Sequence, residues 1–174
     1  MLKIISGGQT GADRAGLDFA IRFGLEHGGW CPKGRRSESG EISSRYLLKE
    51  SHSSNYLVRT EHNVLDSNMT FIFTFGDLNN SRGSKKTAAF CRKHNRPYIL
   101  VNLQSSNSLV SGVMTQYMSK EHVTINVAGS RESGAPGIHE SVLALLSECY
   151  QKINYQNFDT LPSWCSLSEN KHIR

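Results

Sequence analysis

The N-terminal stretch of the chain has the residue types and spacing of a phosphate-binding loop. An apolar run over residues 2–6 leads into a glycine-rich turn, and a helical pattern begins directly after it. Glycines let backbone N–H groups approach an anion closely, and the unpaired amides and dipole of a helix N-terminus favour negative charge. We therefore expect phosphate contacts from the turn residues Gly7, Gly8, Gln9, Thr10 and Gly11.

The turn does not identify the ligand by itself. It nearly matches the dinucleotide fingerprint G-x-G-x-x-G, with Ser6 in the first position, but no acidic ribose ligand follows in a recognisable place. No Gly-Lys-Ser/Thr sequence follows at the spacing of a Walker A loop. The alternative is that this segment is a tight turn that joins a strand to a helix and binds no ligand. Asp13, next in the chain, either stabilises the helix through its dipole or hydrogen-bonds a ribose or purine-like ring.

Three later segments supply further candidate ligand-binding residues. Trp30 could stack on a planar heterocycle, with Lys33 and Arg35 binding phosphate, or the three could be a buried tryptophan and two solvated cations. Residues 83–87 resemble a second helix N-terminus, and residues 129–133 follow the last predicted strand, where Arg131 and Glu132 could position a ligand or pair with each other. These segments contribute Gly83, Ser84, Thr87, Gly129, Arg131 and Glu132 as candidates.

Acid–base and metal chemistry have few candidate residues. If the protein is an enzyme, Asp13, Glu61 and Glu132 are the carboxylates that could act as general acid or base. Glu61 lies in the segment 59–67, which a capped, salt-bridged helix would also explain. The cysteines and histidines show no C-x-x-C or H-x-x-x-H spacing, so we predict no metal site.

Strands and helices alternate along the chain, which predicts an α/β fold. We expect one Rossmann-like domain with a mostly parallel sheet and helices on both faces. Loops at the carboxyl ends of parallel strands line the ligand crevice, so the three glycine-bearing loops at 7–11, 76–83 and 129–137 should converge. The predicted strands are 2–6, 30–31, 70–75, 98–103 and 122–128, and the predicted helices are 12–27, 45–50, 59–69, 85–94, 109–119 and 138–150.

Length and composition fit a single globular unit. A chain of 174 residues with 37% hydrophobic and 20% charged residues can bury a sizeable core. We expect a ligand-binding domain over 1–154 and a C-terminal tail over 155–174. Met1 leads straight into a core strand without a signal peptide, and no apolar run is long enough to cross a membrane, so we expect a cytoplasmic location with reduced thiols.

The net charge of +5 does not indicate a nucleic-acid interface. The basic residues are scattered singly or in pairs and do not form a stripe with aromatic residues between them. A mild positive field of this kind would still attract a small anionic ligand. We therefore expect a small phosphorylated ligand as the partner and regard nucleic acid as disfavoured.

Four motifs together resemble one family. They are Ser-Gly-Gly-Gln-Thr-Gly-Ala-Asp-Arg at 6–14, Gly-Gly-Trp-Cys-Pro-Lys-Gly-Arg at 28–35, Arg-Thr-Glu-His-Asn-Val-x-Asp-Ser at 59–67, and Ala-Gly-x-Arg-Glu-Ser at 128–133. In this order they resemble the putative molybdenum carrier proteins, relatives of the YpsA-like proteins and of the group containing the lysine-decarboxylase-like enzymes and DprA. The resemblance covers about the first 150 residues. It implies a Rossmann-like fold, a homo-oligomer (dimer or tetramer) and a pocket for a nucleotide-like or pterin-like phosphate.

The chain departs from the family pattern at its presumed pocket. Ser130 stands where the family usually has Pro, and His139 where it often has Tyr. The run P-G-G-x-G-T-x-x-E of the related hydrolases is missing, and Gly83-Ser84-x-x-Thr87 occupies a comparable place without the glutamate. The first hypothesis is therefore a binding or carrier protein for molybdenum cofactor (molybdopterin) or a nucleotide. The alternatives are a nucleotide-processing hydrolase and, least favoured, a single-stranded nucleic-acid binder.

Overall fold

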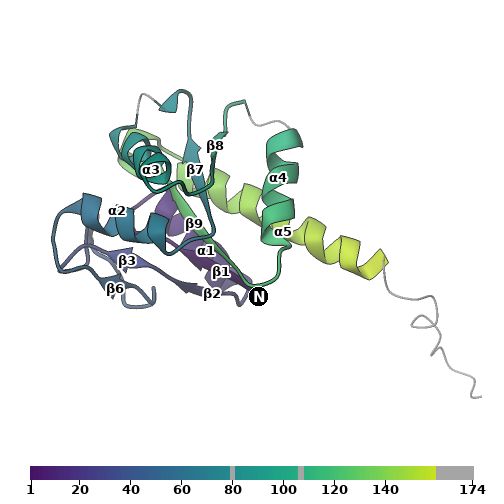
Figure 1. Cartoon of the computed structure of the whole chain (residues 1–174), viewed down its shortest axis with the longest axis horizontal. Coiled ribbons are helices and arrows are strands. Elements are labelled where there is room, and N and C mark those ends of the chain that lie inside the picture. Colours follow the sequence, from purple (N-terminus) through teal and green to yellow (C-terminus); the bar gives the residue numbers. More distant parts are fainter. Residues whose placement is uncertain (79–80, 106–107, 160–174) are drawn as a thin grey trace, which may run out of the picture.

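A five-stranded parallel sheet forms the centre of the fold (Figure 1). The computed structural model describes residues 1–78, 81–105 and 108–159, with side chains through 153. The strand order is β2-β1-β9-β7-β8, so the last strand along the chain lies in the middle of the sheet. In sequence order the strands are β1 (Leu2–Ile5), β2 (Glu26–Gly28), β7 (Met69–Thr74), β8 (Tyr98–Asn102) and β9 (Val123–Gly129).

Helices cover both faces of this sheet, as the alternating pattern predicted. One layer holds α1, α4 and α5, where α5 contacts both of the others, and α2 packs with α3 against the opposite face (Figure 1). Phe71 and Phe73 of β7 point into the core shared with α1 and α5, where Phe19 also lies fully buried. The helices are α1 (Ala12–Arg22), α2 (Tyr56–Leu65), α3 (Arg82–Lys93), α4 (Ser108–Met118) and α5 (Ile138–Asp159).

The segment between β2 and α2 forms a small structure beside the main sheet. Its parallel pair is β3 (Trp30–Cys31) with β6 (Lys49–Glu50), and its hairpin is β4 (Arg36–Ser37) with β5 (Gly40–Glu41). A second apolar cluster, Leu17, Cys31, Ile42, Tyr46 and Leu48, fills the space beneath it.

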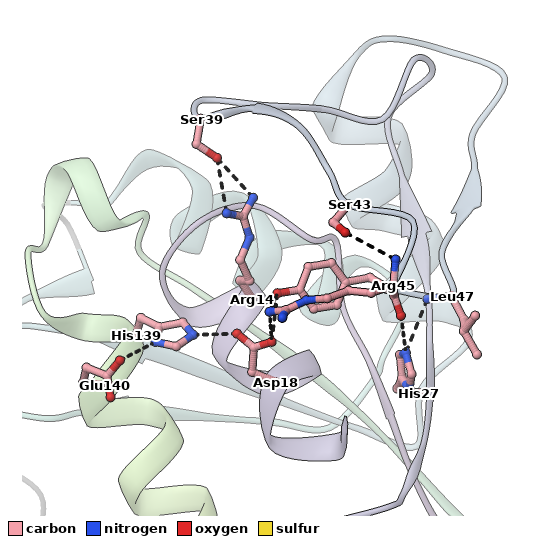
Figure 2. A network of polar contacts seen from close by, with 10 residues as sticks. Arg14, Asp18, His27, Ser39, Ser43, Arg45, Leu47, His139 and Glu140 are labelled. Carbon is pink, nitrogen blue, oxygen red and sulfur yellow. Dashed lines mark hydrogen bonds and ion pairs between the residues drawn. The ribbon is translucent and has the colours of Figure 1, made fainter. Parts of the chain in front are cut away.

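A polar network fastens this segment to two helices (Figure 2). Asp18 of α1 accepts a hydrogen bond from the Tyr46 hydroxyl at 2.8 Å and pairs with Arg45 at 2.5 Å. The Nε2 atom of His139, at the start of α5, lies 2.9 Å from the other Asp18 oxygen. Arg14 of α1 reaches Ser39 in the hairpin at 3.2 Å. The network therefore ties the hairpin region, α1 and α5 into one body.

Several predicted elements were wrong in extent or type. The helix predicted over 12–27 ends at Arg22, because Gly24 adopts a left-handed conformation (φ 65°), and the residues after it form the edge strand β2. The predicted helix over 45–50 is a turn followed by β6, because burial of Tyr46 and Leu48 in the second cluster overrides local propensity. The strand predicted over 98–103 is β8, which lies at the edge of the sheet, so that its Leu100 is 44% exposed.

The C-terminal helix extends further than the sequence indicated. α5 continues to Asp159, past the predicted domain end at 154, and residues 160–174 of the predicted tail lie outside the described residues. No helix among the described residues is long and apolar enough to span a membrane. Cys31, Cys91 and Cys149 are free and buried, and burial raises the pKa of each thiol, while Cys165 lies in the undescribed part.

Candidate functional site: a basic cavity at the carboxyl end of the sheet

A cavity of about 520 Å³ lies where the loops after β1 and β9 meet the N-terminal turns of α2 and α3. The structure thus brings the three glycine-bearing loops of the sequence together. Its lining comprises Gln9, Asp13, Tyr56, Leu57, Arg59, Thr60, Ser81, Arg82, Gly83, Lys86, Thr87, Ala128, Gly129, Ser130, Arg131, Ser133 and Gly134.

A buried ion pair forms the floor of the site. Arg59 of α2 donates from Nη1 to Asp13 Oδ2 at 2.8 Å, and the two side chains are only 11% and 5% exposed. Burial raises the pKa of Asp13, and the neighbouring Arg59 opposes that rise. The Arg59 Nε atom is buried and has no hydrogen-bond partner among the described residues. Arg59 begins the motif over 59–67 but was not named among the predicted ligand-binding residues, although its spacing of four from Asn63 places both on the buried face of α2.

The glycines of the N-terminal turn are packed against the protein's own chain. A Cβ on Gly7 would lie 1.5 Å from Arg59 Nη1, and one on Gly11 would lie 2.5 Å from the Ser130 carbonyl oxygen. The amide of Ala12, at the start of α1, donates to that same carbonyl at 3.2 Å. The loop after β9 therefore lies against the α1 N-terminus, and Gly7, Gly8, Thr10 and Gly11 do not line the cavity.

Gln9 is the turn residue that does reach the cavity. Its Oε1 accepts from the amides of Thr10 and Glu38, each at 3.0 Å, which fixes the orientation of the side chain. Its Nε2 is buried without a hydrogen-bond partner among the described residues, and the residue is only 3% exposed. An unsatisfied buried donor is costly, so this atom indicates a place for a ligand acceptor.

Beside the cavity, the carboxylate of Glu38 in the hairpin accepts hydrogen bonds from groups that could otherwise donate to a bound anion. Its carboxylate accepts from the Thr10 hydroxyl, and from the Ser133 amide at 3.3 Å and the Ser133 hydroxyl at 2.6 Å. Burial raises the pKa of Glu38, but the hydrogen bonds from Ser133 and Thr10 outweigh it, so that the pKa lies below its ordinary value. This contact could not be predicted from the sequence, because Glu38 lies in a polar loop.

The opposite wall of the cavity is formed by the start of α3. Ser81 caps this helix by accepting from the Ser84 amide at 3.3 Å, and Arg82, Gly83, Lys86 and Thr87 line the cavity. Ser84 itself is fully buried behind the cap and does not line the cavity. The positive end of the helix dipole and two basic side chains thus act on the same space.

Arg131 brings a further cation from the loop after β9. Its guanidinium carbon lies 5.3 Å from the centre of the Tyr56 ring. Together with Arg59, Arg82 and Lys86, it makes the lining strongly basic, and Asp13 is the one carboxylate among the described lining residues. This surplus of positive charge attracts anions into the cavity.

Three aromatic or basic residues predicted as ligands lie elsewhere. Trp30 lines a separate cavity of about 170 Å³, and its Nε1 donates to Asp66 at 2.7 Å. The guanidinium of Arg35 donates to the carbonyl oxygens of Ile42, Ser43, Tyr46 and Leu48, so it braces the hairpin region. Lys33 is exposed and lines neither cavity.

Two of the candidate acid–base residues are also outside the cavity. Glu61 pairs with Lys93 at 2.7 Å and with His94 at 2.6 Å between α2 and α3, and these contacts lower its pKa. Glu132 accepts from the amides of Gly137 and His139 at the start of α5. Asp13 alone of the three lines the cavity. Among the described residues, no group of three or more His, Cys, Asp or Glu side chains could hold a metal ion.

The cavity lies within the part of the chain that known proteins share. The family described as Circularly permutated YpsA SLOG family matches residues 4–150. The chain belongs to this family. A similar solved structure is the crystal structure, at 1.45 Å resolution, of "Putative molybdenum carrier protein" from Syntrophus aciditrophicus SB, which confirms the resemblance seen in the motifs. The two chains are 41% identical with a TM-score of 0.77, over 83% of this chain and 92% of that one. No curated protein matches the chain.

Proposed function

We propose that this YpsA-family protein binds and carries a small phosphorylated molecule in the basic cavity. The observation that carries the proposal is the buried Nε2 of Gln9, which has no partner in the described part of the chain. It belongs to a lining in which the described residues supply four cations, Arg59, Arg82, Lys86 and Arg131, and one carboxylate. A volume of about 520 Å³ is in the usual range for small-molecule sites.

The phosphate belongs at the start of α3 in this proposal. Arg82 and Lys86 extend from the first two turns, and the dipole of a twelve-residue helix favours an anion there. The N-terminus of α1, by contrast, already donates to the Ser130 carbonyl. We therefore assign phosphate binding to the start of α3 and not to the glycine-rich turn over residues 7–11.

Two cargoes fit this chemistry, molybdenum cofactor and a nucleotide. The similar structure is named "Putative molybdenum carrier protein", which supports a carrier role. Carriage is favoured over hydrolysis because Asp13, the lining carboxylate, is engaged by Arg59 and so is poorly placed to move a proton. A homo-oligomer and a cytoplasmic location stay predictions.

Calorimetric titration of the full chain with inorganic phosphate, ribose 5-phosphate, nucleoside monophosphates and molybdopterin tests the proposal. We expect binding that Arg82→Ala and Lys86→Ala each weaken about tenfold. Lys33→Ala is the matched control, because Lys33 is an exposed cation outside the cavity. Failure of every phosphorylated probe to bind, or an equal loss in Lys33→Ala, would refute the cavity as the site. Release of free base from a nucleotide would establish hydrolysis in place of carriage.

A further inference from the structure

We propose that Tyr56 is the platform on which the planar ring of the ligand stacks, and that Arg131 leaves this ring on binding to become the counter-charge of the ligand. The inference rests on the proposed function, because it names the residue that recognises the organic part of a phosphorylated ligand. Stacking was expected from Trp30, but that ring lies in the other cavity with its Nε1 bound to Asp66.

Tyr56 is held firmly at the edge of the cavity. It is the first residue of α2, and the preceding Asn55 caps the helix by accepting from the Leu57 amide at 3.0 Å. The Tyr56 side chain is half-buried, and it is the one aromatic residue among the described lining residues. With Leu57 beside it, Tyr56 forms an apolar wall in an otherwise polar and basic cavity.

Arg131 lies over the Tyr56 ring, and its charge also acts on the carboxylates of Asp13 and Glu38. Its guanidinium carbon is 5.3 Å from the ring centre, within the range of a cation–π contact. Among the described residues no carboxylate lies within ion-pair distance of it. A guanidinium is planar and weakly hydrated, so another planar group can replace it on the face of the Tyr56 ring.

The backbone of Arg131 is fixed while its side chain can move. The Arg131 carbonyl accepts from the amides of Gly134 at 3.2 Å and Ala135 at 3.0 Å, which anchors the loop. Tyr56 and the start of α3 line the same cavity, so one ligand can place its ring on Tyr56 and its phosphate beside Lys86. Arg131, displaced from the ring, can then pair with the anion in the same cavity.

The test compares ligands with and without a ring. Dissociation constants of AMP, GMP and ribose 5-phosphate are measured on the full chain carrying Tyr56→Leu or Tyr56→Phe. Stacking of a base on an aromatic side chain contributes about 5- to 150-fold in affinity. We expect the wild-type chain to bind AMP and GMP more tightly than ribose 5-phosphate by a factor in this range. Tyr56→Leu should abolish the preference for nucleotides over ribose 5-phosphate by weakening the binding of AMP and GMP, with the dissociation constant of ribose 5-phosphate unchanged. Tyr56→Phe should keep the preference.

Tyr117→Leu is the matched control. Tyr117 also carries a cation on its ring, with Lys120 Nζ at 3.8 Å, but it lies on α4 away from the cavity. This substitution should leave the nucleotide preference intact. Arg131→Gln should weaken AMP by about tenfold and ribose 5-phosphate less, because only a ligand with a ring displaces Arg131 from Tyr56 toward the phosphate.

The outcomes separate this inference from the proposed function. If ribose 5-phosphate binds but the nucleotides gain nothing, or the preference survives in Tyr56→Leu, the stacking platform is refuted and the phosphate site stands. If Arg131→Gln strengthens nucleotide binding and leaves ribose 5-phosphate unaffected, Arg131 only covers the ring and the second half of the inference is overturned. If no phosphorylated probe binds the wild-type chain, the proposed function and this inference both fall.

Discussion

Arg59 occupies the space that a side chain on Gly7 would need, since its Nη1 lies 1.5 Å from the position of a Cβ there. The same guanidinium forms the ion pair with Asp13. Gly7 is therefore a glycine because a buried ion pair packs onto its Cα, and the close approach is made by this protein's own cation.

Gly7→Ala should destabilise the fold by about 1–3 kcal/mol, the usual range for overpacking a well-filled interior. The added methyl group must push Arg59 off Asp13, and both partners are enclosed. Urea unfolding followed by circular dichroism measures the change. Gly112→Ala is the control, because its new Cβ meets nothing within 4 Å in α4, and it should not lower stability. Equal stability of Gly7→Ala and the wild type would show that Arg59 can move at no cost.

The ion pair itself should behave as a coupled unit. Asp13→Ala or Arg59→Met alone should cost about 3–5 kcal/mol, because each leaves an uncompensated charge in a buried place. The double substitution should cost less than the sum of the two, and a double-mutant cycle in urea measures the difference. Strict additivity would mean that solvent reaches the pair in spite of its burial.

Glu38 should make the stability of the hairpin region depend on pH. Its pKa in the folded protein lies below the ordinary value of 4.5, so its contribution is present above that value and is lost as the pH falls through the folded pKa. Wild-type chain and Glu38→Gln should therefore differ in melting temperature near neutral pH and converge in acid. A difference that stays constant down to acid pH would show that the charge of Glu38 is not what Thr10 and Ser133 stabilise.

The Tyr46 hydroxyl should contribute measurably to the network of Figure 2. Tyr46 is nearly fully buried, and its hydroxyl donates to the Asp18 carboxylate at 2.8 Å. Tyr46→Phe should cost about 1.5–3 kcal/mol, the range for a hydrogen bond to a charged group. Tyr98→Phe is the control in thermal unfolding, because the Tyr98 hydroxyl accepts a hydrogen bond from Arg92 in an exposed contact. Similar losses in the two variants would contradict the assigned role of the buried network.

The sheet was predictable from local signals where a strand is buried by its neighbours on both sides. β1, β7 and β9 appear in the sequence as short apolar, β-rich runs, and each precedes a loop with glycine. β2 and β6 carry no such signal: Glu26 and Lys49 are polar, and these strands form because a partner strand is present. Their pairing is a tertiary effect that single-residue preferences do not contain.

The sequence predicted which loops meet at the site, but it did not predict all of the side chains that line the cavity. Gln9, Asp13, Gly83, Thr87, Gly129 and Arg131 were expected there and line the cavity. Tyr56 was not predicted, and Arg59 was singled out only as the first residue of the motif over 59–67, because no glycine marks α2 and its packing with α3 is not visible in the sequence. Trp30 and Arg35 were misplaced because the contacts that engage them, with Asp66 and with four carbonyl oxygens, are invisible in the sequence.

Because β9 is the central strand, the five-stranded sheet cannot be completed before this strand has been translated. β1 pairs with β2, and β7 with β8, but the two pairs share no neighbour until Val123–Gly129 has been translated. The nascent chain up to that point holds two separate strand pairs whose inner edges are open to wrong partners. Ser130, Arg131 and Ser133, which close the cavity, are translated later still. The lining of the cavity is therefore incomplete until the chain has been translated through Ser133 and Gly134, so the cavity cannot form during the early stages of folding.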